Sequence, residues 1–435
     1  MDILFIDSPY DYGGDSIDFN VEGSLLDLRR KCMNPGLLNI ASYCEFKGLN
    51  VKILASASMG NIKKKIDQIL NCKNPKLIVL SVMSGMSYTN AIKIIDYIKR
   101  INQTIKIIAG GWHIRCINLY AFNDSKLLDA ICVCEGEDVI YEYFLYPEKK
   151  HIGVIKRGEK IFQEDYYRIF DLEKAPPVNY HLYPGYQEYR PYIEESRSCP
   201  RQCIHCVHSK YSTPYRCVSL SKFKRDFNYC YQVYGRNSYY TLLAANFGIN
   251  PKSTIDKLEY LVDKEVQWSA EMHVENPWEK YIDLLSNAGM KSVSIGLETV
   301  SGRILKIMGK TLDEQRYVNR AKSMIRNFHN KGIFVKVNLM SYPDETFSEF
   351  KQTLEFVRQN REYIDDINAS AIISFANTKL DDMFEEGVWK YSYKMRTRFS
   401  ENTYLFPVES TLEGMSYNNI LEVYSDFKRE MNFSI

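Results

Sequence analysis

The strongest constraint on the fold is a repeated alternation of short β-rich runs with amphipathic helical stretches. Over residues 1–145 the runs predict five strands, at residues 3–7, 51–55, 77–82, 105–109 and 130–133. Apolar residues recur at helical spacing between them, as at Leu37, Ile40, Ala41 and Cys44. Strands that alternate with helices pair in parallel, because each helix returns the chain to the same end of the sheet. We therefore predict a doubly wound, Rossmann-like α/β domain.

A second alternation runs over residues 191–385. Its six candidate strands are residues 192–195, 239–243, 266–271, 292–297, 334–339 and 369–374. Inner runs that read as apolar on both faces predict a TIM-like (β/α)6 barrel, closed or partial. Between the two alternations, residues 146–190 contain Arg157-Gly158, Pro176-Pro177 and Pro184-Gly185, which indicates a hairpin and an extended linker. Residues 386–435 are expected to form a short aromatic C-terminal cap.

The overall composition gives no electrostatic reason to expect a nucleic-acid or membrane-surface partner, although a local basic patch stays open. Lysine plus arginine total 56 and aspartate plus glutamate total 54, for a net charge of +2, so the overall charge does not favour nucleic acid. The N-terminus lacks the basic segment of a signal peptide, and no uninterrupted apolar run reaches about eighteen residues. We expect a cytoplasmic protein that is not transmembrane. In that reducing compartment the eleven cysteines are seldom disulfides, so a tight group of them indicates a metal site.

Cys199, Cys203 and Cys206 form such a group, directly after a predicted strand. Three thiolates on one loop can wrap one metal centre, and thiolates are the standard ligands of Fe–S clusters. Three ligands leave one iron of a four-iron cube open to a small molecule that carries an amine and a carboxylate. Zinc on Cys203, Cys206 and His205 or His208 is an alternative, although structural zinc usually pairs two such cysteine knuckles. Chance clustering is the other alternative.

The CxxxCxxC spacing after the first strand of a βα barrel resembles the radical S-adenosylmethionine (SAM) superfamily. That resemblance implies a [4Fe–4S] cluster on Cys199, Cys203 and Cys206, with SAM bound at the open iron and cleaved to a 5′-deoxyadenosyl radical. Residues 266–271 and 294–299 resemble the third and fourth strands of the family. No cysteine follows Cys230, which excludes auxiliary clusters built on downstream cysteines.

The resemblance also implies a set of SAM contacts. His205 stands where the family keeps an aromatic residue beside the adenine, Glu298 where a residue contacts the ribose, and Lys310 where a basic residue holds the methionine carboxylate. Ligand groups collect at the carboxyl ends of parallel strands. Charges there are also often plain salt bridges of the barrel rim, and that alternative stays open for Glu298 and Lys310.

Two segments depart from the family's pattern. After the second strand, relatives carry an acid that binds the SAM amino group, whereas this chain has Asn246, which accepts a hydrogen bond but supplies no charge. Glu271 is the alternative contact for that amino group. On the fifth strand, residues 340–346 resemble a Gly-x-Pro-Gly-Glu-Thr turn with serine and aspartate in the glycine places, which changes backbone freedom near the adenine.

Small residues mark two loops of the first domain, at 81–87 and 109–113. Doubly wound sheets bind ligands outside the carboxyl ends of their strands, where the strand order switches. Together with residues 35–38 and 134–137, these loops resemble the cobalamin (B12)-binding domain that precedes the barrel in one radical SAM group. The resemblance implies that the corrin and its nucleotide tail are lined by Ser81, Ser84, Gly110 and Gly111.

The Asp-x-His-x-x-Gly motif that supplies a lower axial histidine in other cobalamin proteins is absent. Cobalamin would then lack a protein histidine ligand. A vestigial domain without cobalamin is the alternative.

These expectations combine into a radical SAM enzyme, either a cobalamin-dependent methyltransferase or a rearrangement enzyme, acting on an unactivated carbon. The expected partners are a small-molecule, natural-product, lipid or peptide substrate and an external electron donor such as flavodoxin or ferredoxin, without nucleic acid. One alternative is a cobalamin-free radical SAM enzyme that forms a C–C or C–S bond. A degenerate, partner-binding member is the other, because the acid after the second strand is missing. No catalytic residue beyond the cluster ligands is identified.

Overall fold

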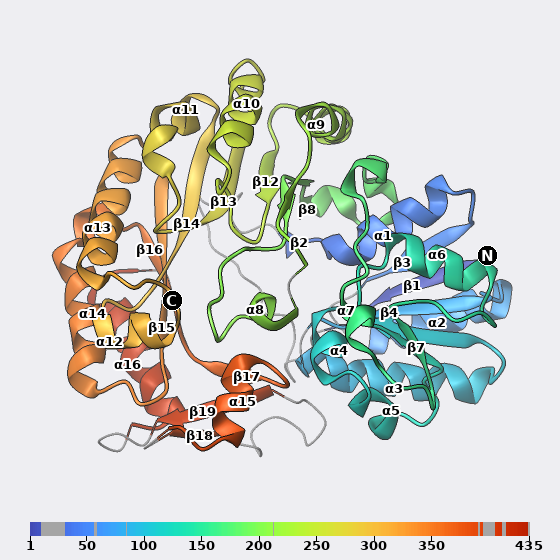
Figure 1. Ribbon diagram of the computed structural model, residues 1–435. Coiled ribbons are helices and arrows are strands. Elements are labelled where there is room, and N and C mark those ends of the chain that lie inside the picture. Colours follow the sequence, from blue (N-terminus) through green and yellow to red (C-terminus); the bar gives the residue numbers. More distant parts are fainter. Residues whose placement is uncertain are drawn as a thin grey trace. The chain divides into compact units, whose positions relative to one another are not determined.

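The computed structural model describes residues 1–9, 31–55, 59–83, 85–211, 213–389, 392–394, 405–410 and 415–433. The chain divides between Pro191 and Tyr192 into two compact units, and each is built on a six-stranded sheet (Figure 1). Within these described ranges, the helices are all too short or too polar to cross a membrane.

The first unit is a doubly wound α/β domain, as predicted. Its sheet has the order β3-β1-β4-β5-β6-β7, and all neighbours are parallel except β6 and β7. The strands are β1 (Ile3–Asp7), β3 (Val51–Leu54), β4 (Leu77–Ser81), β5 (Lys106–Gly110), β6 (Ala130–Cys132) and β7 (Val154–Lys156). The helices are α1 (Pro35–Phe46), α2 (Met59–Cys72), α3 (Gly85–Ile101), α4 (Trp112–Ile117), α5 (Tyr120–Asp124) and α6 (Glu137–Leu145). Figure 1 shows α1 and α6 on one face of this sheet and α2 and α3 on the other.

The strand order reverses between β1 and β4. The chain passes from β1 outward to β3 and then returns to β4 on the other side of β1. The loops after β1 and β4 therefore diverge, and their divergence opens the ligand crevice of such sheets. Asn34 fixes the helix beside this switch, because its side chain accepts a hydrogen bond from the Leu37 backbone N–H and Pro35 begins α1.

Residues 146–190, predicted as a hairpin and linker, lie within the first unit. β7 adds an antiparallel strand to the sheet, opposite β6. The remaining elements are α7 (Gln163–Tyr166), η2 (Leu172–Lys174), η3 (Tyr180–Leu182), η4 (Tyr186–Glu188) and β8 (Tyr189–Arg190), which pairs with β2 (Lys31–Cys32). Asn179 ties this segment to α1 through hydrogen bonds with Ser42 and Glu45.

The second unit is a partial barrel of six parallel strands in the order β16-β15-β14-β13-β12-β9. The strands are β9 (Tyr192–Glu194), β12 (Tyr239–Leu243), β13 (Gln267–His273), β14 (Met290–Glu298), β15 (Phe334–Ser341) and β16 (Asp366–Ala371). Between the strands lie α9 (Leu220–Tyr234), α10 (Pro251–Val262), α11 (Ile282–Asn287), α12 (Gly302–Ile307), α13 (Glu314–Asn330) and α14 (Phe347–Gln359). Figure 1 shows α10, α11, α13 and α14 along the outer face of the curved sheet.

The inner face of this sheet is polar, so the prediction of strands apolar on both faces was wrong. Along β15, Val335 and Val337 are buried, whereas Lys336 and Asn338 are partly exposed. β14 alternates in the same way, with Ser294 partly exposed. The helices cover only the outer face, and polar residues therefore line the concave face.

The sixth strand was predicted about three residues too late. β16 pairs with β15 from Asp366, opposite Lys336, to Ala371, opposite Ser341. η6 (Arg361–Tyr363) precedes β16, and β17 (Ile373–Phe375) and α15 (Lys379–Glu385) follow it. The described part of the predicted C-terminal cap forms β18 (Ser392–Lys394), β19 (Leu405–Ser410) and α16 (Tyr417–Glu430). α16 lies against β16, and Arg358 pairs with Glu430.

Candidate functional site

The three cysteines lie on a loop that a short antiparallel ribbon closes at its base. β10 (Ser196–Arg197) pairs with β11 (Arg216–Cys217). Ser198 then turns the chain into the loop with a φ of 70°, and its hydroxyl lies 2.6 Å from the Thr213 hydroxyl oxygen. A left-handed backbone is unfavourable for a residue with a side chain, so the surrounding contacts hold this turn in place.

Backbone contacts attach the loop to the rim of the barrel. The Ile204 N–H donates to the Met308 carbonyl at 3.1 Å, and the Ile204 carbonyl accepts from the Leu380 N–H at 3.2 Å. Gln202 accepts from the Lys379 ammonium at 3.2 Å. These contacts tie the cysteine loop to the end of α12 and to the start of α15.

The three thiols are electrostatic neighbours. Burial raises the pKa of the Cys203 thiol, and it raises the pKa of Cys206 to about 11. Both are therefore protonated near neutral pH, and a metal must displace those protons to bind. Among the described residues, no three His, Cys, Asp or Glu side chains are placed around a single metal ion. A four-iron cube is larger than one ion and separates its ligands further.

His205 lies within this loop, with its ring edge-on to Tyr342 at a centroid distance of 6.2 Å. Burial lowers the pKa of His205 to about 4, so the ring is neutral. Its Nδ1 atom is buried and has no hydrogen-bond partner among the described residues. An unpaired buried nitrogen beside three thiols fits a site that a further group completes.

Glu298 and Lys310, predicted to contact different parts of SAM, form one ion pair here. The Lys310 ammonium lies 3.0 Å from Glu298 Oε1 and 3.0 Å from the Gly296 carbonyl oxygen. Both side chains are buried. Burial alone would lower the pKa of Lys310, but the Glu298 carboxylate raises it well above its ordinary value. The pair places one cation and one anion beside the cysteine loop, since both charges also act on Cys203.

The end of β14 is shaped around this pair. The register between β14 and β15 shifts between Gly296 and Glu298, and Glu298 has a φ of 67°. A β-bulge that forces a side-chain residue into the left-handed region aims that side chain at the cost of strain. A Cβ atom on Gly296 would lie 3.0 Å from Glu298 Oε1 and 3.3 Å from the Lys310 nitrogen. The missing side chain leaves open a cradle over the two charges.

The fifth-strand turn keeps its glycine-like backbone without glycine. Asp344 occupies the second glycine place with a φ of 56°, a conformation that aspartate tolerates better than most residues. The buried Glu345 carboxylate accepts hydrogen bonds from the Tyr342 N–H and the Thr299 hydroxyl. The turn that carries Tyr342 beside His205 is thereby fixed.

The side-chain amide of Asn246 makes its hydrogen bonds within the protein. Its Oδ1 accepts from the His273 backbone N–H at 3.0 Å and from Asn276 Nδ2 at 2.6 Å, and its own amide nitrogen donates to Asn276 Oδ1. Both lone pairs of Oδ1 are therefore used. The structure gives Asn246 a role in joining the ends of β12 and β13, and the hypothesis of an ammonium contact receives no support.

Glu271, the alternative contact for the SAM amino group, has no ion-pair partner among the described residues. It lies on the concave face in register with Ser294, and its side chain is solvent-exposed. Partial desolvation within the curved sheet raises the pKa of Glu271, and Glu298 raises it further, whereas Lys336 lowers it.

In the first unit, the predicted cobalamin residues lie at the carboxyl ends of β4 and β5. The Ser81 hydroxyl accepts from Asn34 Nδ2, which also donates to the half-buried Asp7 carboxylate. Gly110 ends β5, and Gly111 has a φ of 102°, with a Cβ position only 2.5 Å from the Val82 carbonyl oxygen. The positive φ and this close approach to the Val82 carbonyl oxygen each exclude a side chain at Gly111.

Ser84, the fourth of these residues, lies outside the described residues. His113, in the turn after Gly111, is 2% exposed, and burial lowers its pKa to about 3.

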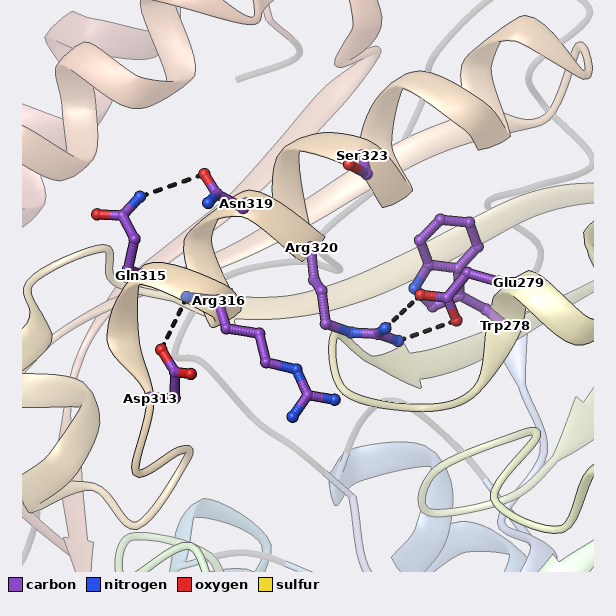
Figure 2. Close-up of a pocket in the computed structure, with 8 residues that line it drawn as sticks. All are labelled: Trp278, Glu279, Asp313, Gln315, Arg316, Asn319, Arg320 and Ser323. Atoms are coloured by element: carbon purple, nitrogen blue, oxygen red, sulfur yellow. Dashed lines mark hydrogen bonds and ion pairs between the residues drawn. The ribbon is translucent and has the colours of Figure 1, made fainter.

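A pocket of about 580 Å³ lies apart from every predicted site residue (Figure 2). It lies between η5 (Trp278–Lys280) and the start of α13. Figure 2 shows the Arg320 guanidinium paired with the Glu279 carboxylate beside the Trp278 ring. The other two charged residues that line the pocket, Asp313 and Arg316, carry opposite charges. The net charge of the lining therefore favours neither an anionic nor a cationic ligand.

Comparison with known protein families identifies two domains. The model of the radical SAM superfamily matches residues 193–357, and the model of the B12 binding domain matches residues 25–144. The prediction of a cobalamin-binding domain followed along the chain by a radical SAM barrel is confirmed at the level of these two families.

Two curated relatives align over most of the chain. A protein of Pyrococcus horikoshii named as an uncharacterized methyltransferase is 23% identical over an alignment of 328 residues that covers 71% of this chain and 70% of that protein. A protein of Methanocaldococcus jannaschii named as a methylthiotransferase is 24% identical over 378 residues, covering 80% of this chain and 76% of that protein.

Two solved structures share the fold. The radical SAM methyltransferase TsrM from Kitasatospora setae, with cobalamin and a [4Fe–4S] cluster bound, superposes with a TM-score of 0.75 at 13% identity, over 98% of this chain and 91% of TsrM. The cobalamin-dependent SAM radical enzyme OxsB, with aqua-cobalamin and SAM bound, superposes with a TM-score of 0.70 at 14% identity, over 94% of this chain and 64% of OxsB. At these identities the similarity shows the fold.

Proposed function

We propose that this chain, whose residues 193–357 match the radical SAM superfamily and whose residues 25–144 match the B12 binding domain, is a cobalamin-dependent radical SAM methyltransferase acting on an unactivated carbon. The observation that carries the proposal is the arrangement at the carboxyl end of the second sheet. There, a loop with three neighbouring thiols lies against a buried carboxylate–ammonium pair.

The cofactors would supply the difficult chemistry, and the protein would place them. When bound, the cluster would supply the electron that cleaves SAM to methionine and a 5′-deoxyadenosyl radical, and cobalamin would supply a transferable methyl group. Cys199, Cys203 and Cys206 would hold the cluster through their thiolates. His205 would lie beside the adenine, with Tyr342 behind its ring.

The buried ion pair would separate around SAM. Glu298 would accept a hydrogen bond from a ribose hydroxyl, and Lys310 would donate to the methionine carboxylate. A buried pair that is already charged needs no proton transfer to make either bond, and its low-dielectric surroundings strengthen both.

Replacing Glu298 with glutamine is expected to raise the SAM dissociation constant about tenfold to hundredfold, because a charge-assisted hydrogen bond is lost. Lys310→Met should act in the same direction. Neither variant should lose iron, since neither residue is a proposed cluster ligand. Anaerobic equilibrium dialysis with labelled SAM, alongside iron analysis, measures both effects. Unchanged SAM affinity in both variants would restore the interpretation of a plain rim salt bridge.

In the first unit, Ser81, Ser84, Gly110 and Gly111 would line the cobalamin site at the switch in strand order. Anaerobic protein supplied with hydroxocobalamin is expected to retain about one equivalent. Its reduced Co(II) spectrum in electron paramagnetic resonance should lack nitrogen splitting from a lower ligand, because the axial-histidine motif is absent and His113 is buried. Gly111→Ala serves as the matched variant and should retain less cobalamin. A clear nitrogen splitting would contradict the missing lower ligand.

Product analysis tests the reaction type. With dithionite as reductant and SAM present, a cobalamin-dependent methyltransferase forms both 5′-deoxyadenosine and S-adenosylhomocysteine. A cobalamin-free radical enzyme forms the first product alone, and a degenerate member forms neither. The names of the two curated relatives support transfer of a methyl or methylthio group over rearrangement.

We further propose that the protein works in the cytoplasm with an external electron donor of the flavodoxin or ferredoxin class. Its substrate would be a small molecule, a natural product, a lipid or a peptide. The polar concave face of the barrel, with Glu271, Ser294 and Lys336 in register, favours a substrate with polar groups.

A further inference from the structure

A buried histidine, His273, lies beside the proposed SAM site. His273 is the last residue of β13 and lies in register with Gly296 of β14, whose missing side chain opens the cradle over Glu298 and Lys310. His273 is 7% exposed. Lys310, Arg201 and His205 are its electrostatic neighbours, and the Tyr317 ring lies at a centroid distance of 5.9 Å. It is therefore part of the same site.

The hydrogen bonds of His273 fix which ring nitrogen carries the proton. The Glu275 backbone N–H donates to His273 Nδ1 at 3.1 Å, so Nδ1 is an acceptor. Burial, with Lys310 and Arg201 nearby, lowers the pKa of His273 well below its ordinary value, which keeps the ring neutral. The single ring proton must then be on Nε2, and this nitrogen is a donor.

That donor has no acceptor in the part of the chain that the structure describes. His273 Nε2 is buried and has no hydrogen-bond partner among the described residues. His205 Nδ1, on the facing cysteine loop, is unpartnered in the same way. A buried polar atom without a partner is unfavourable. Because His205 is an electrostatic neighbour of His273, one polar group bound between β13 and the loop would satisfy both nitrogens.

The neighbouring charges limit what that group is. Arg201 is paired with Glu275 at 2.8 Å and Lys310 with Glu298 at 3.0 Å, and Lys310 is the cation proposed to leave its partner for SAM. A donor needs an acceptor. Of the two SAM groups that chelate iron, only the carboxylate still has lone pairs that accept a hydrogen bond, because the amine uses its one lone pair on the iron.

We propose that His273 is a further SAM-binding residue, whose Nε2–H donates to the methionine carboxylate of SAM beside Lys310. This inference rests on the proposed function. Asn246 would then be a positioning residue, because its Oδ1 accepts a hydrogen bond from the His273 backbone N–H and so fixes the backbone that carries the ring.

Two substitutions separate the two ring nitrogens. Asparagine places its amide near the position of Nδ1, and glutamine places its nitrogen near the position of Nε2. In the reconstituted holoprotein, His273→Asn is expected to raise the SAM dissociation constant about tenfold, whereas His273→Gln stays near the wild-type value. The reverse order, equal losses, or no loss in either variant would overturn the proposal.

A change in the ligand keeps the test valid even if one variant folds poorly. Decarboxylated SAM lacks the proposed acceptor, so wild type and His273→Asn should bind it equally, as in a double-mutant cycle. A loss of the same size with this ligand would assign His273 a merely structural role. A shifted cluster reduction potential with unchanged SAM affinity would place the donor on a cluster sulfide instead and overturn the proposal.

The failure of this inference differs from the failure of the proposed function. Wild-type protein that takes up no iron or binds no SAM would reject the function. Wild-type protein that binds SAM as tightly as His273→Asn would reject only the role of His273.

Discussion

Replacing Cys203 with alanine is expected to abolish uptake of a [4Fe–4S] cluster and with it all SAM cleavage. Three thiolates are the minimum that holds such a cluster with one open iron, so no partial site remains. Cys199→Ala and Cys206→Ala should give the same result. Iron and sulfide analysis after anaerobic reconstitution, with the electron paramagnetic resonance spectrum of the reduced protein, measures the loss.

The chain contains a matched control for this experiment. Cys217 lies on β11 at the base of the same loop, where its sulfur is 2.8 Å from the Tyr215 hydroxyl oxygen. Cys217→Ala should therefore retain the cluster. Stoichiometric zinc in place of iron, or loss of iron on replacing Cys217, would contradict the assignment of the three ligands.

The alternation of strands and helices predicted both sheets, because period and length identify parallel strands even in a single sequence. The partly polar inner face of the barrel was also visible: Val335 and Val337 alternate with Lys336 and Asn338, the pattern of a strand with one polar face. A strand with this alternation is apolar on one face only, so the prediction of two apolar faces did not follow from it.

The boundary of β13 had a larger consequence. Ending the strand at residue 271 hid His273, although Ser269, Glu271 and His273 share one face by the two-residue period of a strand. Continuing the period by one step would have brought the histidine into the site.

Asn246 shows what a sequence alone does not contain. Its position after β12 predicted a ligand contact, but its amide pairs with Asn276, thirty residues further along the chain. Pairings of this kind depend on how two loops meet in space, and no local period or motif encodes them. The attachment of residues 146–190 to α1 through Asn179 is of the same kind.

Glu195 and Lys257 form a buried ion pair at the base of the cysteine loop. Glu195 precedes β10 and Lys257 lies on α10; their side chains are each 1% exposed and 2.7 Å apart. Lys257 also donates to the Glu195 carbonyl oxygen, which accepts from the Val218 N–H as well. Both ends of the cysteine loop are thereby tied to one buried charge pair.

Lys257→Ala is expected to lower the free energy of unfolding of the second unit by about 3–5 kcal/mol, because it leaves the Glu195 carboxylate buried and uncompensated. A double variant, Lys257→Met with Glu195→Leu, should recover most of that loss, since removing both charges together also removes their desolvation cost. Urea unfolding of the apoprotein measures both, with Lys306→Ala, which breaks a more exposed pair, expected to keep the wild-type midpoint. A single variant as stable as wild type would mean that the pair contributes little. A double variant no more stable than the single one would show instead that Lys257 acts through its backbone contacts to the loop.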